Sequence, residues 1–293
     1  LAGSQTPTAA SGGVLGTLGT GTITSQGGGS VNWINLTYSE AGSFQLNTTG
    51  VVSNFLASGL ALDATVFNAS GVQTNRVGRF VPAGFAVSGF SAAHRSAMSC
   101  ASPSSFTYLD EDVTLGFTLT AQNAAGGTTR NYVGSYAKLD LSTPGNFSLA
   151  GISGTTMFKP GTRVSTSAST GTWATGGSAG TAAITLTARM ARAAAPDGPF
   201  DTAQFGIVPT DADGVTMLTL NLDTDSPANG ADRTLLGQIP LRHGRLRLRA
   251  AGDFFRRPTT DDGGPVAERR HEFRHGANRL FDGHRRKIGR AHV

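Results

Sequence analysis

Apolar and polar residues alternate along much of this chain with a period of two, which is the period of a β-strand and not that of a helix. In residues 113–121, VTLGFTLTA, every odd-numbered residue is apolar and every even-numbered residue is Thr or Gly. The same alternation recurs in residues 182–190, AAITLTARM. Each stretch therefore predicts an antiparallel strand with one buried and one exposed face.

Turn-forming residues separate these stretches from other strand candidates. The Gly- and Asn-rich turn QNAAGGTTR leads from the first stretch into an expected returning strand at residues 131–141, NYVGSYAKLDL. Five further stretches have strand-like patterns: residues 31–38, 42–48, 64–69, 204–210 and 214–223. No helical pattern lies between them, so the sequence predicts an all-β fold of two to three consecutive immunoglobulin-like antiparallel β-sandwich domains.

Composition shifts suggest where these domains begin and end. Residues 1–29 are polar and of low complexity, which is typical of a linker. Pro82 interrupts an apolar stretch after the first group of strands, and strand patterns become weak between Thr143 and Gly180. We therefore expect β-sandwich domains at residues 30–80 (incomplete at its N-terminus), 81–155 and 156–249, followed by a disordered Arg-rich tail at residues 250–293.

The positive charge of the chain is confined to its C-terminal end. Residues 241–293 hold 14 of the 24 Lys and Arg and 6 of the 19 Asp and Glu, a net charge of +8, which leaves −3 for residues 1–240. A basic surface attracts polyanions only where its charges lie. The first 240 residues therefore give no electrostatic reason to expect nucleic-acid binding, and a nucleic-acid binder acting through the tail is kept as a second alternative.

The tail has the features of non-native sequence. Its last six residues, Ile288 to Val293, match one reading frame of a widely used sequencing adapter, and the Arg-, Gly- and Pro-rich stretch before them has no regular period. We interpret residues 250–293 as a frameshift followed by adapter read-through; the alternative is a natural disordered basic tail. Leu1 in place of an initiator Met, with no signal peptide, also suggests a fragment of a longer chain. No stretch of 18 apolar residues could span a membrane.

Two groups of carboxylates are candidates for binding or structural roles. Asp110, Glu111 and Asp112 precede the first alternating stretch, where a solvated turn is expected. The second group is spread over residues 211–225, DADGVTMLTLNLDTD, and consists of Asp211, Asp213, Asp223 and Asp225. Alternate carboxylates around a Gly turn suit Ca²⁺, although the stretch lacks the terminal Glu of an EF-hand loop. A turn beside a strand is the alternative interpretation.

Catalytic motifs are weak in this sequence. The stretch GTLGTGT lacks the final Gly-Lys-Ser/Thr of a phosphate loop, and no Gly-x-Ser-x-Gly motif occurs. Before residue 240, His94 is the sole histidine, and Cys100 is the sole cysteine of the chain. A catalytic Cys–His pair would need an exposed Cys100 with a lowered pKa; the alternative is a loop histidine and a structural or externally paired cysteine. We expect no catalytic residues.

Five stretches, in order, resemble the C-terminal region of the MshQ-like proteins of mannose-sensitive haemagglutinin pilus biogenesis. They are LTYSEAGSFQL, VGRFVPAGF, FTYLDEDVTLGFTLTAQNAAGGTTRNYVGSYAKL, PDGPF with FGIVPTDADGV, and LRHGRLRL. The resemblance runs from about residue 30 to Leu248 and ends where RAAGDFF departs from the family pattern. In that family the region is a domain of unknown function, so no site residues carry over.

This resemblance implies a large bacterial protein of the cell surface or extracellular space, encoded with type IV pilus machinery. We therefore expect a non-enzymatic structural or adhesive protein whose partners are pilus or cell-surface proteins or glycans. We expect no cofactor, no nucleic-acid partner and no membrane-spanning segment in these residues. A first alternative is a calcium-stabilised accessory module of a secreted enzyme, with the carboxylates of residues 211–225 as ligands.

Overall fold

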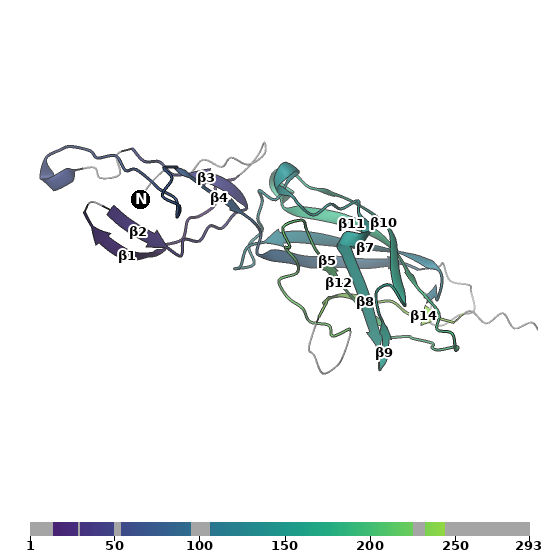
Figure 1. Ribbon diagram of the computed structural model, residues 1–293. Helices are drawn as coiled ribbons and strands as arrows, with labels where there is room; N and C mark the ends of the chain where they lie inside the picture. Colours follow the sequence, from purple (N-terminus) through teal and green to yellow (C-terminus); the bar gives the residue numbers. More distant parts are fainter. Residues whose placement is uncertain (1–13, 29, 50–53, 95–105, 225–231, 244–293) are drawn as a thin grey trace, which may run out of the picture. The chain divides into compact units, whose positions relative to one another are not determined.

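The computed structural model describes residues 14–28, 30–49, 54–94, 106–224 and 232–243 (Figure 1). The chain divides into two units, residues 1–245 and 246–293, and the second unit, which contains the predicted tail, lies outside the described residues. Within the described part, the helices are four short 3₁₀ turns: Phe55–Ala57, Gly134–Tyr136, Pro144–Asn146 and Gly176–Ser178. The prediction of an all-β fold is confirmed.

The largest sheet contains both of the alternating stretches and has the strand order β10-β11-β7-β5. Its strands, all paired antiparallel, are β5 (Gly84–Ala93), β7 (Asp112–Gln122), β10 (Val164–Trp173) and β11 (Thr181–Met190). In β7 and β11, buried side chains alternate with half-buried or exposed ones along the whole strand. We call this sheet the first sheet.

A second four-stranded antiparallel sheet has the order β13-β12-β8-β9. Its strands are β8 (Phe147–Ser153), β9 (Thr156–Phe158), β12 (Gln204–Pro209) and β13 (Thr234–Gln238). Both sheets contribute to one hydrophobic core. Phe117 of β7 meets Phe147 of β8 edge to face, with ring centroids 6.3 Å apart. Each fully buried Leu or Phe in this core stabilises the fold by about 1.5–3 kcal/mol.

The two sheets correct the predicted domain boundary at residue 155. Strands β5 and β7 come from the expected domain 81–155, whereas β10 and β11 come from the expected domain 156–249, yet all four lie in the first sheet. In the second sheet, β8 likewise pairs with β12 across that boundary. Strand patterns are weak near this boundary, but the Ser- and Thr-rich stretch 164–173 forms β10 because it pairs along its length with β11, which carries the apolar side chains of this part of the sheet.

Three expected strands are absent from the described structure. Residues 64–69 form only an isolated bridge, between Phe67 and Gln73. Residues 131–141 form a turn and a 3₁₀ helix in place of the returning strand, since β5 and β11 already occupy both sides of β7. Residues 214–223 have strand-like alternation but form isolated bridges, in which Met217 pairs with Phe85 and Leu222 with Arg233. This segment crosses from the first sheet to the second, so neither sheet takes it up as a full strand.

Smaller sheets complete the fold. Two antiparallel two-stranded sheets precede the sandwich in sequence, formed by β1 (Thr22–Gly27) with β2 (Ser30–Ile34) and by β3 (Gly42–Gln45) with β4 (Arg76–Phe80). The short strands β6 (Thr107–Tyr108) and β14 (Leu241–Arg242) pair in parallel. In the stretch LRHGRLRL, Leu241 and Arg242 form β14, and residues 244–248 lie outside the described part of the chain.

One buried carboxylate links the stretch before β3 to the loop that follows β7. Glu40 is 7% exposed, and its Oε1 and Oε2 atoms accept hydrogen bonds from the backbone N–H groups of Arg130 at 3.2 Å and Asn131 at 3.1 Å. Burial raises the pKa of Glu40, while the hydrogen bonds from backbone N–H groups and the nearby Arg130 guanidinium act in the opposite direction. The Asn131 side chain in turn binds the backbone of Val14 through both its oxygen and its nitrogen.

Candidate interaction surface

Asp211, the first candidate calcium ligand, is a buried turn residue that protein donors already satisfy. Its Oδ1 atom accepts hydrogen bonds from the N–H groups of Asp213 and Val215, each at 2.8 Å. Its Oδ2 atom accepts a hydrogen bond from the Tyr132 hydroxyl at 2.6 Å. Burial and this bond to the Asp211 carboxylate raise the pKa of Tyr132 well above its ordinary value. This geometry holds a turn in place, as the alternative interpretation of this stretch expects.

The other candidate ligands that the structure describes do not join Asp211 in a cation-binding group. Asp213 forms an ion pair with Arg79 of β4, and Asp223 lies next to the Leu222–Arg233 bridge. Asp225 lies outside the described residues. Within residues 14–243, excluding the gaps given above, the structure brings together no group of three or more His, Cys, Asp or Glu that could hold a metal ion.

His94 and the carboxylates of residues 110–112 line a polar cleft of about 450 Å³. The Nδ1 atom of His94 lies 3.1 Å from the Thr107 hydroxyl, and partial burial lowers the pKa of the imidazole. Asp112 forms an ion pair with Arg189 at 2.7 Å, and Asp110 pairs with Arg192 at 3.0 Å. Hydrogen bonding to Arg189 keeps the pKa of Asp112 below its ordinary value. Cys100, the other residue considered for catalysis, lies outside the described residues.

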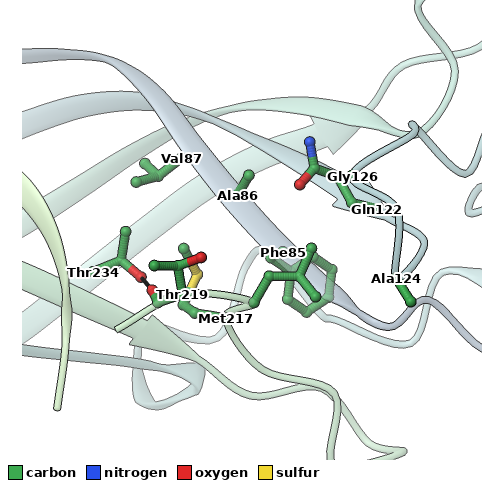
Figure 2. A pocket seen from close by; sticks show the side chains of 10 residues that line it. Phe85, Ala86, Val87, Gln122, Ala124, Gly126, Met217, Thr219 and Thr234 are labelled. Carbon is green, nitrogen blue, oxygen red and sulfur yellow. Dashed lines mark hydrogen bonds between the residues drawn. The ribbon is translucent and has the colours of Figure 1, made fainter. Parts of the chain in front are cut away.

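A shallow groove of about 380 Å³ lies beside the outer edge of β5 (Figure 2). Phe85, Ala86 and Val87 of β5 form one side of it, and Met217 and Thr219 lie opposite. All ten lining residues are uncharged. The groove is bounded at one end by backbone hydrogen bonds, since the Phe85 N–H donates to the Thr216 carbonyl at 2.8 Å and the Leu218 N–H donates to the Phe85 carbonyl at 3.0 Å.

The edges of both sheets have features that discourage the addition of another strand. β5 has an irregular register between Ser88 and Ser91, and β10 has one between Thr166 and Ala168. In the second sheet, β9 has three residues, and β13 pairs with its neighbour through a shifted register. Bulges and short strands protect sheet edges from pairing with another chain. The faces of the sheets are therefore more promising as binding surfaces than the edges.

The outward face of the first sheet is formed by short, uncharged side chains. β7 contributes Thr114, Gly116, Thr118 and Thr120, and the residues opposite them in β11 are Thr187, Thr185, Ala183 and Thr181. The adjoining positions of the edge strands are Ala86, Ser88, Ser91 and Ala93 in β5 and Ala168, Thr170 and Thr172 in β10. We call these fifteen positions the threonine face. The Arg189–Asp112 ion pair lies at one end of it.

The second sheet differs because a segment of the chain covers its outward face. Ala150 of β8 is 1% exposed although it points away from the shared core, and its partner Gly206 is also buried. A Cβ atom at Gly206 would lie 2.7 Å from the Arg233 Cβ and 3.1 Å from a Leu222 methyl group. Arg233 also donates a hydrogen bond to the Ser148 hydroxyl at 3.1 Å. Within the described part of the chain, nothing comparable covers the threonine face, where Thr114 and Thr185 are exposed.

These features define a class: an antiparallel β-sandwich with one covered and one exposed sheet face. A comparison with known protein families assigns it further, since residues 40–235 match the family described as DUF6701, third domain. The chain belongs to this family, whose domain is uncharacterised. The match includes β3 to β12 and the threonine face. The comparisons with curated proteins and with solved structures gave no match. No helix in the described ranges is long and apolar enough to cross a membrane.

Proposed function

We propose that this protein is a non-enzymatic structural or adhesive component of the bacterial cell surface, associated with type IV pilus biogenesis. The observation that carries the adhesive role is the threonine face, an exposed sheet face that offers hydroxyl and methyl groups from neighbouring strands. The proposed link to the pilus depends on the five stretches that resemble the MshQ-like proteins, four of which lie within the described part of the chain.

An adhesive surface needs a scaffold that keeps its side chains in fixed positions. The threonine face has such a scaffold, because its central strands β7 and β11 are each paired on both sides and place alternate residues in the core. Partners of the pilus or cell surface, whether proteins or glycans, would meet this face without any rearrangement of the sandwich.

Deletion of the gene in its source bacterium tests this proposal. We expect reduced piliation, reduced attachment to surfaces or reduced pilus-dependent motility, with recovery when the gene is returned on a plasmid. A complementing gene that carries Thr114→Lys and Thr185→Lys is expected to restore protein levels but not attachment. A deletion strain with normal piliation, attachment and motility would contradict the proposed function.

A further inference from the structure

The threonine face lacks the side chains that most surface interactions use. All fifteen of its positions are Thr, Ser, Ala or Gly, so the face has no charge, no aromatic ring and no long flexible side chain. A typical soluble surface has roughly 25–35% charged residues. This composition is therefore unusual for a sheet face that is open to solvent.

This composition argues against two classes of partner. Nucleic acids and other polyanions bind through Lys and Arg, and the face provides neither. Protein interfaces depend on a few anchors, most often Trp, Tyr and Arg, which fill pockets on the partner. The threonine face has no such anchor, and its Gly and Ala positions offer little area to bury.

The face does suit a neutral partner that has both hydroxyl and C–H groups. Each Thr presents one hydroxyl, which donates and accepts hydrogen bonds, beside one methyl group. On an antiparallel sheet these groups repeat at about 4.8 Å between strands and about 6.8 Å along a strand. A neutral polysaccharide has the complementary pattern, because its sugar rings carry hydroxyls at their edges and C–H groups on their faces.

We infer that the threonine face binds single chains of neutral polysaccharide. This inference rests on the proposed adhesive function and specifies the class of ligand. Strands in a sheet rotate by about 20–25° from one to the next, so the four strands twist the face by roughly 60–75°. A single flexible chain can follow such a surface, whereas the flat surface of a crystalline polymer contacts only part of it.

Affinity electrophoresis in native gels tests the inference with the full 293-residue chain. The probes are hydroxyethyl cellulose and dextran, which are neutral, and alginate, which is anionic. The variant Thr114→Lys/Thr185→Lys places two long charged side chains on the face. The matched control is Thr155→Lys, in the exposed turn between β8 and β9. Unfolding midpoints of all three proteins show whether each is folded.

We expect a neutral polymer to retard the wild type and the Thr155→Lys control equally. The double variant should bind on the order of tenfold more weakly, which corresponds to about 1.4 kcal/mol. Because the contact involves no charges, added salt should leave the wild-type affinity unchanged. The variant Thr185→Val retains the shape of the side chain but loses the hydroxyl, and it should also bind more weakly.

Two results would overturn the inference: no retardation of the wild type by either neutral polymer, or equal retardation of the wild type and the double variant. A wild-type dimer that the double variant splits in sedimentation would assign the face to a second copy of the chain instead. If the wild type binds no neutral polymer but the deletion strain loses attachment, the inference fails and the proposed function stands. If the wild type binds a neutral polymer but the deletion strain has no phenotype, the inference stands and the proposed function fails.

Discussion

Tyr132 donates its phenolic hydrogen to Asp211 Oδ2 at 2.6 Å, and this bond joins the loop after β7 to the turn after β12. The same hydroxyl oxygen accepts hydrogen bonds from the backbone N–H groups of Lys138 at 3.1 Å and Leu139 at 3.0 Å. The Trp173 ring packs edge-on against Tyr132, with ring centroids 4.8 Å apart. One buried side chain thus fixes two loops and the end of β10.

The substitution Tyr132→Phe should lower the free energy of unfolding by about 1–3 kcal/mol, because it leaves a buried carboxylate oxygen and two N–H groups without a partner. Denaturant unfolding of both proteins measures the difference. A double-mutant cycle with Asp211→Asn should show a coupling energy of about 0.5–3 kcal/mol. Additive effects of the two substitutions would contradict the proposed linkage.

The same pair predicts a pH dependence. The folded-state pKa of Tyr132 is raised above its ordinary value of 10.0, so its contribution to stability is fully present below pH 10 and is lost as the pH rises further. Wild-type stability should therefore fall more steeply above pH 10 than the stability of Tyr132→Phe. Parallel curves from pH 9 to 12 would show that Tyr132 ionises as readily in the folded chain as in the unfolded one.

Glu40 should behave as a buried structural carboxylate. Glu40→Gln removes one of two acceptor oxygens and should destabilise the fold by about 1–3 kcal/mol, because one of the N–H groups of Arg130 and Asn131 loses its partner. Since burial raises the folded-state pKa of Glu40, its contribution is largest below the ordinary value of 4.5 and decreases as the pH rises through the folded-state pKa. The cost of the substitution should therefore be larger at pH 4 than at pH 7.

Urea unfolding of wild type and Glu40→Gln at both pH values measures this cost, with Glu111→Gln as a control in the turn before β7. A cost that increases from pH 4 to pH 7 would have the wrong sign for a carboxyl group whose pKa is raised.

Gly180 is expected to tolerate no side chain. Its φ angle is +83°, and an added Cβ atom would meet the backbone carbonyl of Thr129. Gly180→Ala should therefore cost about 1–3 kcal/mol through backbone strain and displacement of the neighbouring loop. Gly177, three residues earlier, has nothing within 4 Å of an added Cβ. Gly177→Ala should be neutral or slightly stabilising in thermal unfolding, and equal effects at the two positions would contradict this reading of the turn.

The alternative of a calcium-stabilised module gives an opposite expectation that can be measured directly. Because both oxygens of Asp211 accept hydrogen bonds from the protein, we expect Ca²⁺ to leave the melting temperature unchanged. Asp211→Asn should lower stability to the same extent with EDTA and with Ca²⁺. A calcium-dependent rise in melting temperature that Asp213→Ala abolishes would instead favour the alternative, since a ligand of the native state stabilises it by mass action.

The sequence predicted the two central strands of the first sheet, because period-two alternation directly reflects one buried and one exposed face, but it did not predict their neighbours β5 and β10. Residues 113–121 and 182–190 became the central strands β7 and β11. Alternation does not show which strands pair. It also predicts a strand wrongly where a polar side chain makes buried hydrogen bonds. Tyr132 lies in a strand-like stretch, but its hydroxyl accepts hydrogen bonds from the backbone N–H groups of residues 138 and 139. These bonds bend the backbone into a turn around the tyrosine side chain.

The candidate sites show the same limit. The carboxylates of residues 211–225 are close in sequence, but Asp211 and Asp213 make separate contacts: Asp211 with a tyrosine, and Asp213 with an arginine. The Thr and Gly positions of VTLGFTLTA were visible from the start as the opposite face of a strand. These positions form part of a larger surface because Thr185 and Thr187 lie beside them in register. Only the pairing of β11 with β7 reveals this.

The pairing of β14 with β6 has a consequence for biosynthesis. Leu241 lies beside Thr107 in parallel register, so this contact closes a loop of more than a hundred residues. Long-range pairings of this kind slow folding, since the entropy of loop closure is lost before the contacts form. A nascent chain cannot complete this fold until Arg242 has emerged. A change of reading frame beyond Arg245 therefore spares every strand pairing described for this fold, whereas the same change a few codons earlier would remove the last one.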